Sequence, residues 1–177
     1  NYRMLSSHVV DMALTQLTKI DRSYGALPKS NTNHLMLGGW IDHADFLATA
    51  DAVSARGQAL GLEPITVEHL VATYGKDALA IIDIVEFNHE LAERINPDFP
   101  AILAEVPFCL DHEMANSLDD ILSRRIRLGF VNQQQCLQAA PKVADLICAL
   151  GHWEDKRSAL EVEQFQRGLL SQLAPLL

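Results

Sequence analysis

The stretch Asn116–Phe130, NSLDDILSRRIRLGF, contains the clearest structural signals in the chain. Ser117 is followed three residues later by Asp120, the acidic variant of a capping box, which predicts that a helix begins at Ser117. The next apolar residues are spaced three and four apart, as on one face of an amphipathic α-helix: Leu118, Ile121 and Leu122. Gly129 predicts the end of this helix, because glycine is the residue that most often follows a last helical turn.

Two adjacent arginines in this stretch have different predicted surroundings. Arg124 lies one helical turn after Asp120, and such a pair stabilises a helix by only about 0.2–0.5 kcal/mol. Arg125 continues the apolar stripe, so a buried guanidinium there needs a partner such as Glu105, Glu113 or the last carbonyls of another helix. The alternative is that Arg125 extends its charged end to water along its apolar stem. The sequence leaves both possibilities open.

The rest of the chain repeats the helical pattern. Apolar residues recur at helical spacing from Ser6 to Ile20, and Asp42, Thr66 and Asn132 are predicted to begin further helices. Pro141 lies inside the helix that follows Asn132 and predicts a kink or break there. A loop or short extended segment is expected over residues 23–41, where turn-forming residues are frequent. These signals predict an all-α fold, a compact bundle of about seven to nine helices.

The charge and cysteine content exclude several classes of protein. The net charge is −9 and the basic clusters are short, so we expect no nucleic-acid partner, because such proteins carry a basic stripe that neutralises phosphates. No apolar run approaches the roughly 20 residues that span a bilayer. Three cysteines in apolar surroundings, Cys109, Cys136 and Cys148, predict reduced thiols and a cytoplasmic location.

Motifs for catalysis are weak. His112 and Glu113 begin like a zinc-protease helix, H-E-x-x-H, but Asn116 stands where the second histidine ligand is needed. A metal-dependent hydrolase built on these two residues and His89–Glu90 is therefore a minor alternative. Gly38–Gly39 is better explained as a turn than as a phosphate site, because no glycine-rich nucleotide motif accompanies it. We therefore predict no catalytic, cofactor-binding or metal-binding residue in this chain.

Four segments, in order, carry a family resemblance. Ser117–Gly129 resembles the T-L-D-D-x-L-x-R-R-T-R-L-G signature of FAD-dependent glycerol-3-phosphate dehydrogenases, with Ile126 in place of the threonine. His69–Gly75, HLVATYG, is similar to that family's L-x-x-x-Y-G, and Leu103–Ala115 resembles its segment before the signature. Tyr2–Leu5 resembles the end of G-G-K-L-T-T-Y-R-x-M-A, the segment that closes the family's FAD domain.

The resemblance implies a domain organisation and a function. Residues 1–41 would be an N-terminal helix and linker that continue from an FAD domain absent from this chain, and residues 42–177 a helical C-terminal domain. The parent enzyme would oxidise sn-glycerol 3-phosphate to dihydroxyacetone phosphate and pass electrons through FAD to quinone or oxygen. The first residues, NYRM, lack an initiator methionine and support the expectation of an excised fragment.

The resemblance assigns this chain a structural role, with no FAD and no turnover of its own. Its expected partner is the FAD domain of the same polypeptide. The resemblance also allows a homodimer, and a peripheral contact of the parent with the inner face of the membrane. The residues expected to brace the domain are those of the signature and its neighbour: Glu113, Asp119, Asp120, Arg124, Arg125 and Arg127. A stand-alone helical interaction module without flavin chemistry is the alternative interpretation.

Overall fold

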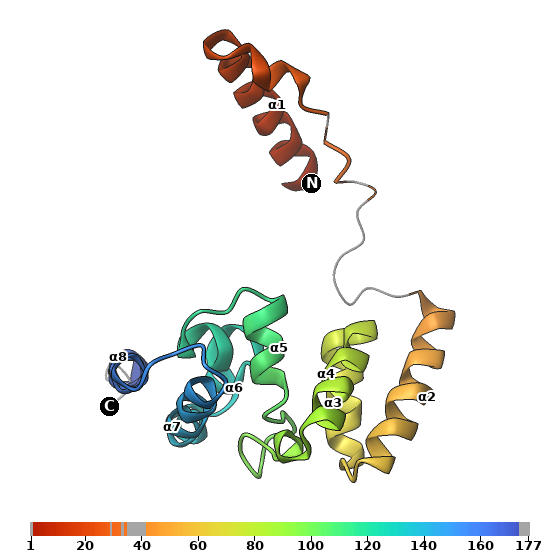
Figure 1. The fold of residues 1–177 in the computed structure, drawn as a ribbon, viewed down its shortest axis with the longest axis vertical. Helices are drawn as coiled ribbons and strands as arrows, with labels where there is room; N and C mark the ends of the chain where they lie inside the picture. Colours follow the sequence, from red (N-terminus) through yellow and green to blue (C-terminus); the bar gives the residue numbers. More distant parts are fainter. Residues whose placement is uncertain (1, 29, 33, 35–41, 174–177) are drawn as a thin grey trace. The chain divides into compact units, whose positions relative to one another are not determined.

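The computed structural model describes residues 2–28, 30–32, 34 and 42–173. Eight α-helices lie in these ranges, and the described residues form no β-strand, which confirms the all-α prediction (Figure 1). They are α1 (Tyr2–Ile20), α2 (His43–Ala59), α3 (Pro64–Tyr74), α4 (Ala78–Phe87), α5 (Glu105–His112), α6 (Leu128–Val131), α7 (Gln133–Ala149) and α8 (Asp155–Leu173). Short 3-10 helices occur at Arg22–Ala26, Gly75–Asp77 and His89–Ala92, and a π-helix at Asp119–Arg125.

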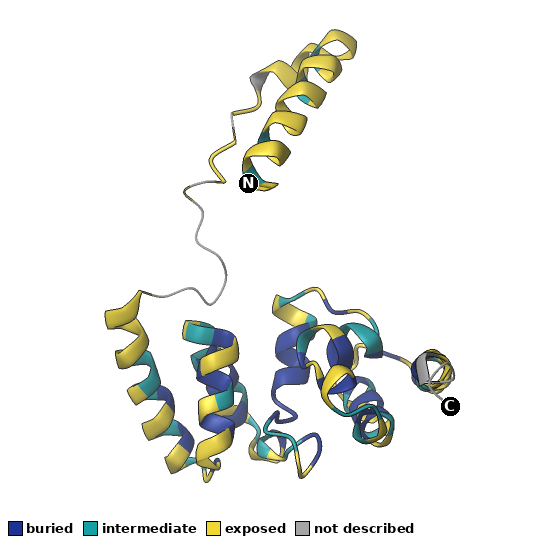
Figure 2. Cartoon of the chain, turned by 180° about the vertical axis from the view of Figure 1, so that it is seen from behind, coloured by how far each residue is buried: buried dark blue, intermediate teal, exposed yellow. Residues whose placement is uncertain are grey.

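The chain divides into two compact units, Asn1–Gly38 and Gly39–Leu177. The first contains α1, in which no residue is buried, and the 3-10 helix Arg22–Ala26 (Figure 2). This 3-10 helix begins after Asp21, whose carboxylate accepts a hydrogen bond from the Ser23 N–H at 2.8 Å. The loop expected over 23–41 is therefore partly helical at its start, and its predicted extended part lies, beyond His34, outside the described residues.

The second unit contains the hydrophobic core, made by the facing sides of α3, α4, α5 and α7 (Figure 2). α2 packs against α3 and α4, α5 contacts α4, α7 and the π-helix, and α8 packs along α7. The largest fully buried apolar side chains come from several of these elements: Leu70, Ile81, Ile82, Ile102, Leu118, Ile121, Leu122, Leu128 and Ile147. The signature segment therefore supplies a large part of the core.

Some predicted helix ends agree with the structure. Asp42 caps α2, its carboxylate accepting from the Asp45 N–H at 2.9 Å, and Asn132 caps α7 in the same way through the Gln135 N–H at 3.1 Å. The prediction that Thr66 begins a helix is wrong. Because proline suits the first helical position, α3 begins at Pro64, and the buried Thr66 hydroxyl donates to the Pro100 carbonyl at 3.0 Å.

α7 continues through Pro141, so of the predicted kink or break the break is absent; Pro141 is exposed. α5 runs from Glu105 to His112. It ends because Met114 adopts a left-handed backbone, with φ of 53°.

The signature helix differs most from its prediction. Residues Asp119–Arg125 form a π-helix, in which the Ile126 N–H donates to the Ile121 carbonyl at 2.9 Å, a spacing of five residues. Arg127 then turns left-handed, with φ of 67°, and α6 begins at Leu128. Gly129 lies inside α6 and does not end the preceding helix. A Cβ atom there would lie 2.7 Å from Ser123 Oγ, so the glycine allows close packing.

Candidate functional site: the signature segment and its groove

The signature segment begins with the predicted capping box. The Asp120 N–H donates to Ser117 Oγ at 3.1 Å, and the Ser117 N–H donates to the Asp120 carboxylate at 3.2 Å. Partial burial alone would raise the pKa of Asp120. The hydrogen bonds from the Asn116 N–H and Ser117 and the neighbouring Arg124 outweigh burial, and the pKa of this carboxyl is lowered.

Helix α8 contributes to the start of the same segment. Arg157 donates to the Asn116 carbonyl at 2.7 Å, and its guanidinium lies over the Trp153 ring, 4.9 Å from the ring centre. Glu161 accepts a long hydrogen bond from the Leu118 N–H at 3.4 Å. The sequence did not indicate these contacts, because they join residues about 40 positions apart on surfaces without a distinctive pattern.

The two adjacent arginines have different partners. Arg124 is exposed and forms ion pairs with Asp120, as predicted, and with Asp119 at 2.6 Å. Arg125 has a side chain that is 25% exposed, and it donates to the Glu113 main-chain carbonyl at 2.6 Å. Glu113 follows the last residue of α5, so Arg125 binds the end of another helix. Its nearest carboxylate is Asp120, at 3.7 Å.

The π-helix explains why Arg125 is not fully buried. In an α-helix the stripe through Leu118, Ile121 and Leu122 would continue to Arg125. The wider turn brings Ile126 into the core instead, where it is 3% exposed. Arg125 moves to the edge of the core, so the expectation of an arginine on the apolar face is only partly correct.

Glu105, the other predicted partner of Arg125, belongs to a separate polar cluster. It is fully buried on α5, and its carboxylate accepts from the Tyr74 hydroxyl at 2.7 Å and the Ile102 N–H at 2.8 Å. His69 Nε2 lies 3.0 Å from the same carboxylate. Burial, followed by the Glu105 charge, raises the pKa of Tyr74.

Glu113 lies two turns further along the chain and has fewer contacts. Its Oε2 atom is buried and has no hydrogen-bond partner among the described residues. Burial, followed by the charge of Glu113, raises the pKa of the neighbouring Cys109 thiol. Cys109 and Cys136 are buried and all three cysteines are free thiols.

These residues border a groove, called here the signature groove, with a volume of about 680 Å³. His69, Thr73 and Tyr74 of α3 line one part of it. The remaining lining includes Phe99, Glu113, Arg124, Arg125, Ile126, Arg127 and Val131. The groove therefore brings together four of the six residues that the sequence singled out. The other two, Asp119 and Asp120, form ion pairs with Arg124, which lines the groove.

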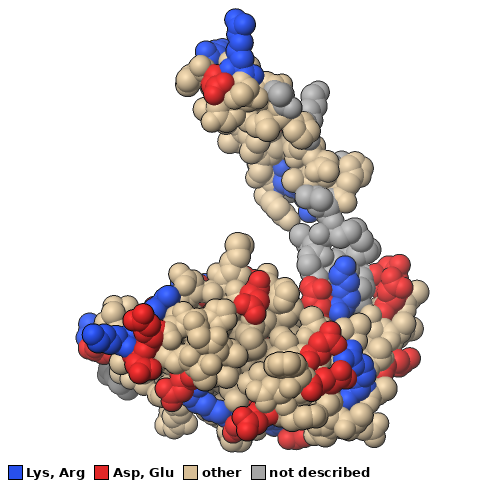
Figure 3. Space-filling model, in the orientation of Figure 1, with Lys and Arg blue, Asp and Glu red and all other residues tan. Residues whose placement is uncertain are grey.

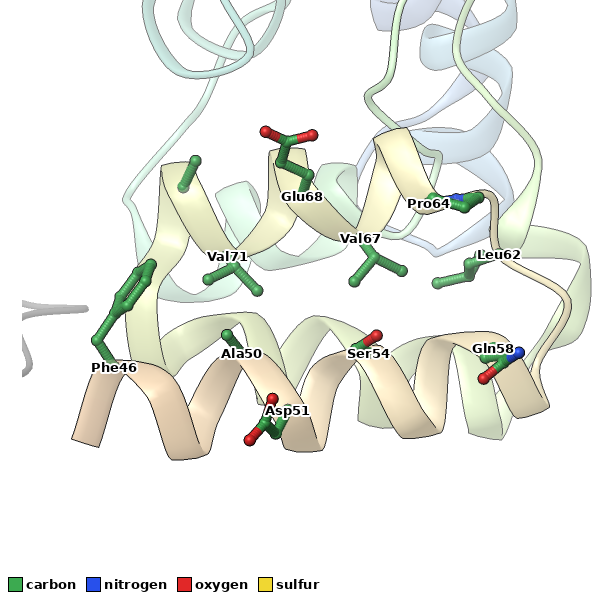
Figure 4. A pocket seen from close by; sticks show the side chains of 11 residues that line it. Phe46, Ala50, Asp51, Ser54, Gln58, Leu62, Pro64, Val67, Glu68 and Val71 are labelled. Atoms are coloured by element: carbon green, nitrogen blue, oxygen red, sulfur yellow. The ribbon is translucent and has the colours of Figure 1, made fainter. Parts of the chain in front are cut away.

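A second groove, of about 760 Å³, lies between α2 and α3 (Figure 4). Val67 and Val71 point toward Ala50 and Ser54 across it, whereas Asp51 and Glu68 point away. Because the side chains facing this space are mainly apolar, it offers no acid–base chemistry.

The described residues show neither a metal site nor a membrane-spanning helix. The described residues contain no group of three or more His, Cys, Asp or Glu side chains able to hold a metal ion, including the predicted alternative around His89, Glu90, His112 and Glu113. Within the same ranges no helix is long and apolar enough to cross a bilayer. On the face of the second unit seen in Figure 3, basic side chains lie beside acidic ones and form no continuous stripe.

Comparison with known proteins decides the family. Residues 30–158 match the C-terminal domain of alpha-glycerophosphate oxidase, a range that includes the signature groove. This chain belongs to that family of C-terminal domains. It is 32% identical over 116 residues to the mitochondrial glycerol-3-phosphate dehydrogenase of Bos taurus, and 31% identical over the same length to that of Homo sapiens. A glycerol-3-phosphate dehydrogenase of Synechocystis is 30% identical over 104 residues.

The matches cover only part of each relative. They include 63% of this chain but 16% of the bovine and human proteins, and 59% of this chain but 19% of the Synechocystis protein. No solved structure matches the chain. The family match agrees with the resemblance carried by the signature.

Proposed function

We propose that the chain is the accessory domain of an FAD-dependent enzyme that oxidises sn-glycerol 3-phosphate to dihydroxyacetone phosphate, with electrons passing to quinone or oxygen. The family match over residues 30–158 supports this proposal, as do the dehydrogenase names of its relatives. The same names favour it over a stand-alone interaction module. The flavin would be held by a separate domain of the same polypeptide, with the enzyme on the cytoplasmic side of a membrane or in the cytoplasm.

In this proposal the chain contributes structure and leaves the chemistry to the flavin domain. The observation that carries it is the arrangement of the signature charges. Arg124 and Arg125 bind Asp119, Asp120 and the end of α5, all within the domain. Arginine stays protonated in proteins, so these side chains cannot act as general acids or bases. They fix the position of the π-helix instead.

The test uses the parent enzyme with Arg125→Ala, compared with the unaltered enzyme. We expect the KM for sn-glycerol 3-phosphate to stay within about twofold of the value for the unaltered enzyme, because in this proposal the substitution removes no contact to the substrate. The half-life of activity at raised temperature should shorten, because a contact between two helices is lost. A large rise in KM with unchanged thermal inactivation would contradict the structural role.

The separate expectation about the isolated chain is tested by spectroscopy. Purified residues 1–177, incubated with FAD and desalted, should retain no flavin absorbance and should not reduce an artificial dye when sn-glycerol 3-phosphate is added. Retained flavin in stoichiometric amount would show that this chain contains a cofactor site.

A further inference from the structure

Two backbone positions beside the signature groove are unusual. Met114 and Arg127 are the only residues other than glycine with positive φ among the described ranges, at 53° and 67°. A hydrogen bond links the two segments that contain them, because Arg125 donates to the carbonyl of Glu113 at 2.6 Å. A left-handed conformation at such a residue costs about 1 kcal/mol or more, and such residues occur both at the ends of helices and at functional sites.

The side chains around these positions are apolar and exposed. Met114 is 88% exposed, Phe130 79% and Val131 69%. Val131 lines the groove together with Arg127, whose carbonyl accepts hydrogen bonds from the N–H groups of both Phe130 and Val131. Methionine, aromatic residues and arginine are the types enriched in protein interfaces.

The cation of Arg127 has no acidic partner among the described residues. Its side chain is exposed, whereas Arg124 and Arg125 form ion pairs. A complementary surface would therefore bring a carboxylate to Arg127.

We propose that Met114, Arg127, Phe130 and Val131, called here the docking face, bind the remainder of the parent enzyme. This inference rests on the proposed function. Relatives devote only 16–19% of their length to the matched region, so most of each polypeptide lies outside this domain. The combination of an exposed cation without an ion-pair partner among the described residues and exposed apolar side chains matches a protein surface. A phosphate polymer would meet Asp119, Asp120 and Glu113 beside the arginines and be repelled.

The test cuts the parent enzyme after it has folded. A site for a specific protease is inserted between Gly38 and Gly39, the boundary of the two units, and the purified enzyme is cleaved. Dissociation of residues 39–177 upon dilution is then measured by analytical size exclusion, which gives an apparent Kd. The variants are Arg127→Glu and Phe130→Glu. The matched control is Phe87→Glu, at a phenylalanine that is 94% exposed on α4 and does not line the groove.

We expect each docking-face variant to raise the apparent Kd at least about tenfold, as central arginine and aromatic residues do, and the control to change it less than about twofold. Melting temperatures of the isolated chains should agree within about 2 °C, which shows that the variants fold.

The other outcomes overturn the inference in distinguishable ways. Tight association in both variants places the interface elsewhere and leaves the proposed function intact. Rapid dissociation of the unaltered enzyme means that no stable docking exists. Self-association of residues 39–177, lost in Arg127→Glu, assigns the face to a second copy. Flavin content and dye reduction by sn-glycerol 3-phosphate, measured on the same uncut preparation, report separately whether the proposed function holds.

Discussion

Glu105 and Glu113 lie on and just after the same short helix, yet their surroundings are opposite. Glu105 is fully buried, and Tyr74, Ile102 and His69 surround its carboxylate at hydrogen-bonding distance. Glu113 is half-buried with one oxygen unpartnered, and its main-chain carbonyl makes the contact to Arg125. A buried carboxylate is tolerated where several hydrogen-bond donors converge on it, as they do at Glu105.

The largest expected loss of stability follows from removing the buried carboxylate of Glu105. Glu105→Ala should lower the free energy of unfolding by about 3 kcal/mol or more, because the Tyr74 hydroxyl and Ile102 N–H would be buried without an acceptor. Glu113→Gln should change it by less than about 1 kcal/mol, since the backbone contact remains. Urea unfolding of both variants measures the contrast, and equal losses would remove the distinction between the two glutamates.

Arg125→Ala should have an intermediate effect. Its side chain is only 25% exposed and donates a charged hydrogen bond to Glu113, so we expect a loss of about 2 kcal/mol. Arg124→Ala, at a 58% exposed side chain, should cost less than about 1 kcal/mol. Chemical denaturation of the two single variants, side by side, would contradict this order if the Arg124 variant were the less stable.

Removing the helix cap at Ser117 should lower the free energy of unfolding somewhat less than removing the Arg125 side chain does. Ser117→Ala deletes the acceptor of the Asp120 N–H, and the loss of a helix cap is typically about 1 kcal/mol. Ser158→Ala is no suitable control because that serine is buried, whereas Ser171 is exposed and serves better. A thermal melt in which Ser117→Ala and Ser171→Ala behave alike would show that the cap is dispensable.

The smallest expected effect is on the stability of the fold at acid pH. The pKa of Asp120 is lowered in the folded state from its ordinary value of 3.8, so the folded chain binds fewer protons than the unfolded chain near that pH. This stabilisation is present above about pH 4 and is lost as the pH falls through the lowered pKa. Asp120→Asn should therefore be less stable at neutral pH and should lose less stability between about pH 5 and pH 2. Parallel acid-unfolding curves for the two proteins would exclude the effect.

The contrast between the two glutamates was only partly visible in the sequence. Glu105 interrupts the apolar run Ala101–Cys109, and this signal could have predicted a buried carboxylate in need of donors. Its donors Tyr74 and His69 lie more than 30 residues away. Local patterns around Tyr74 could not indicate which group its hydroxyl would contact.

Local patterns determined much of this protein. The helical class, the capping box at Ser117, the caps at Asp42 and Asn132 and the pair Arg124–Asp120 depend on residues within about one helical turn. Contacts over such short spacings are fixed largely by the backbone geometry of a single helix, so the sequence was sufficient to predict them.

The tertiary structure decided the rest. The π-helix, the left-handed turn at Arg127, the glycine inside α6 and the carbonyl partner of Arg125 each depend on how separate helices fit together. Packing Leu118, Ile121, Leu122 and Ile126 into one core requires a wider turn than an α-helix has, and this moves Arg125 to the edge. Such choices are set by competition between burial, hydrogen bonding and close packing across the whole domain, and no short segment of the sequence contains that information.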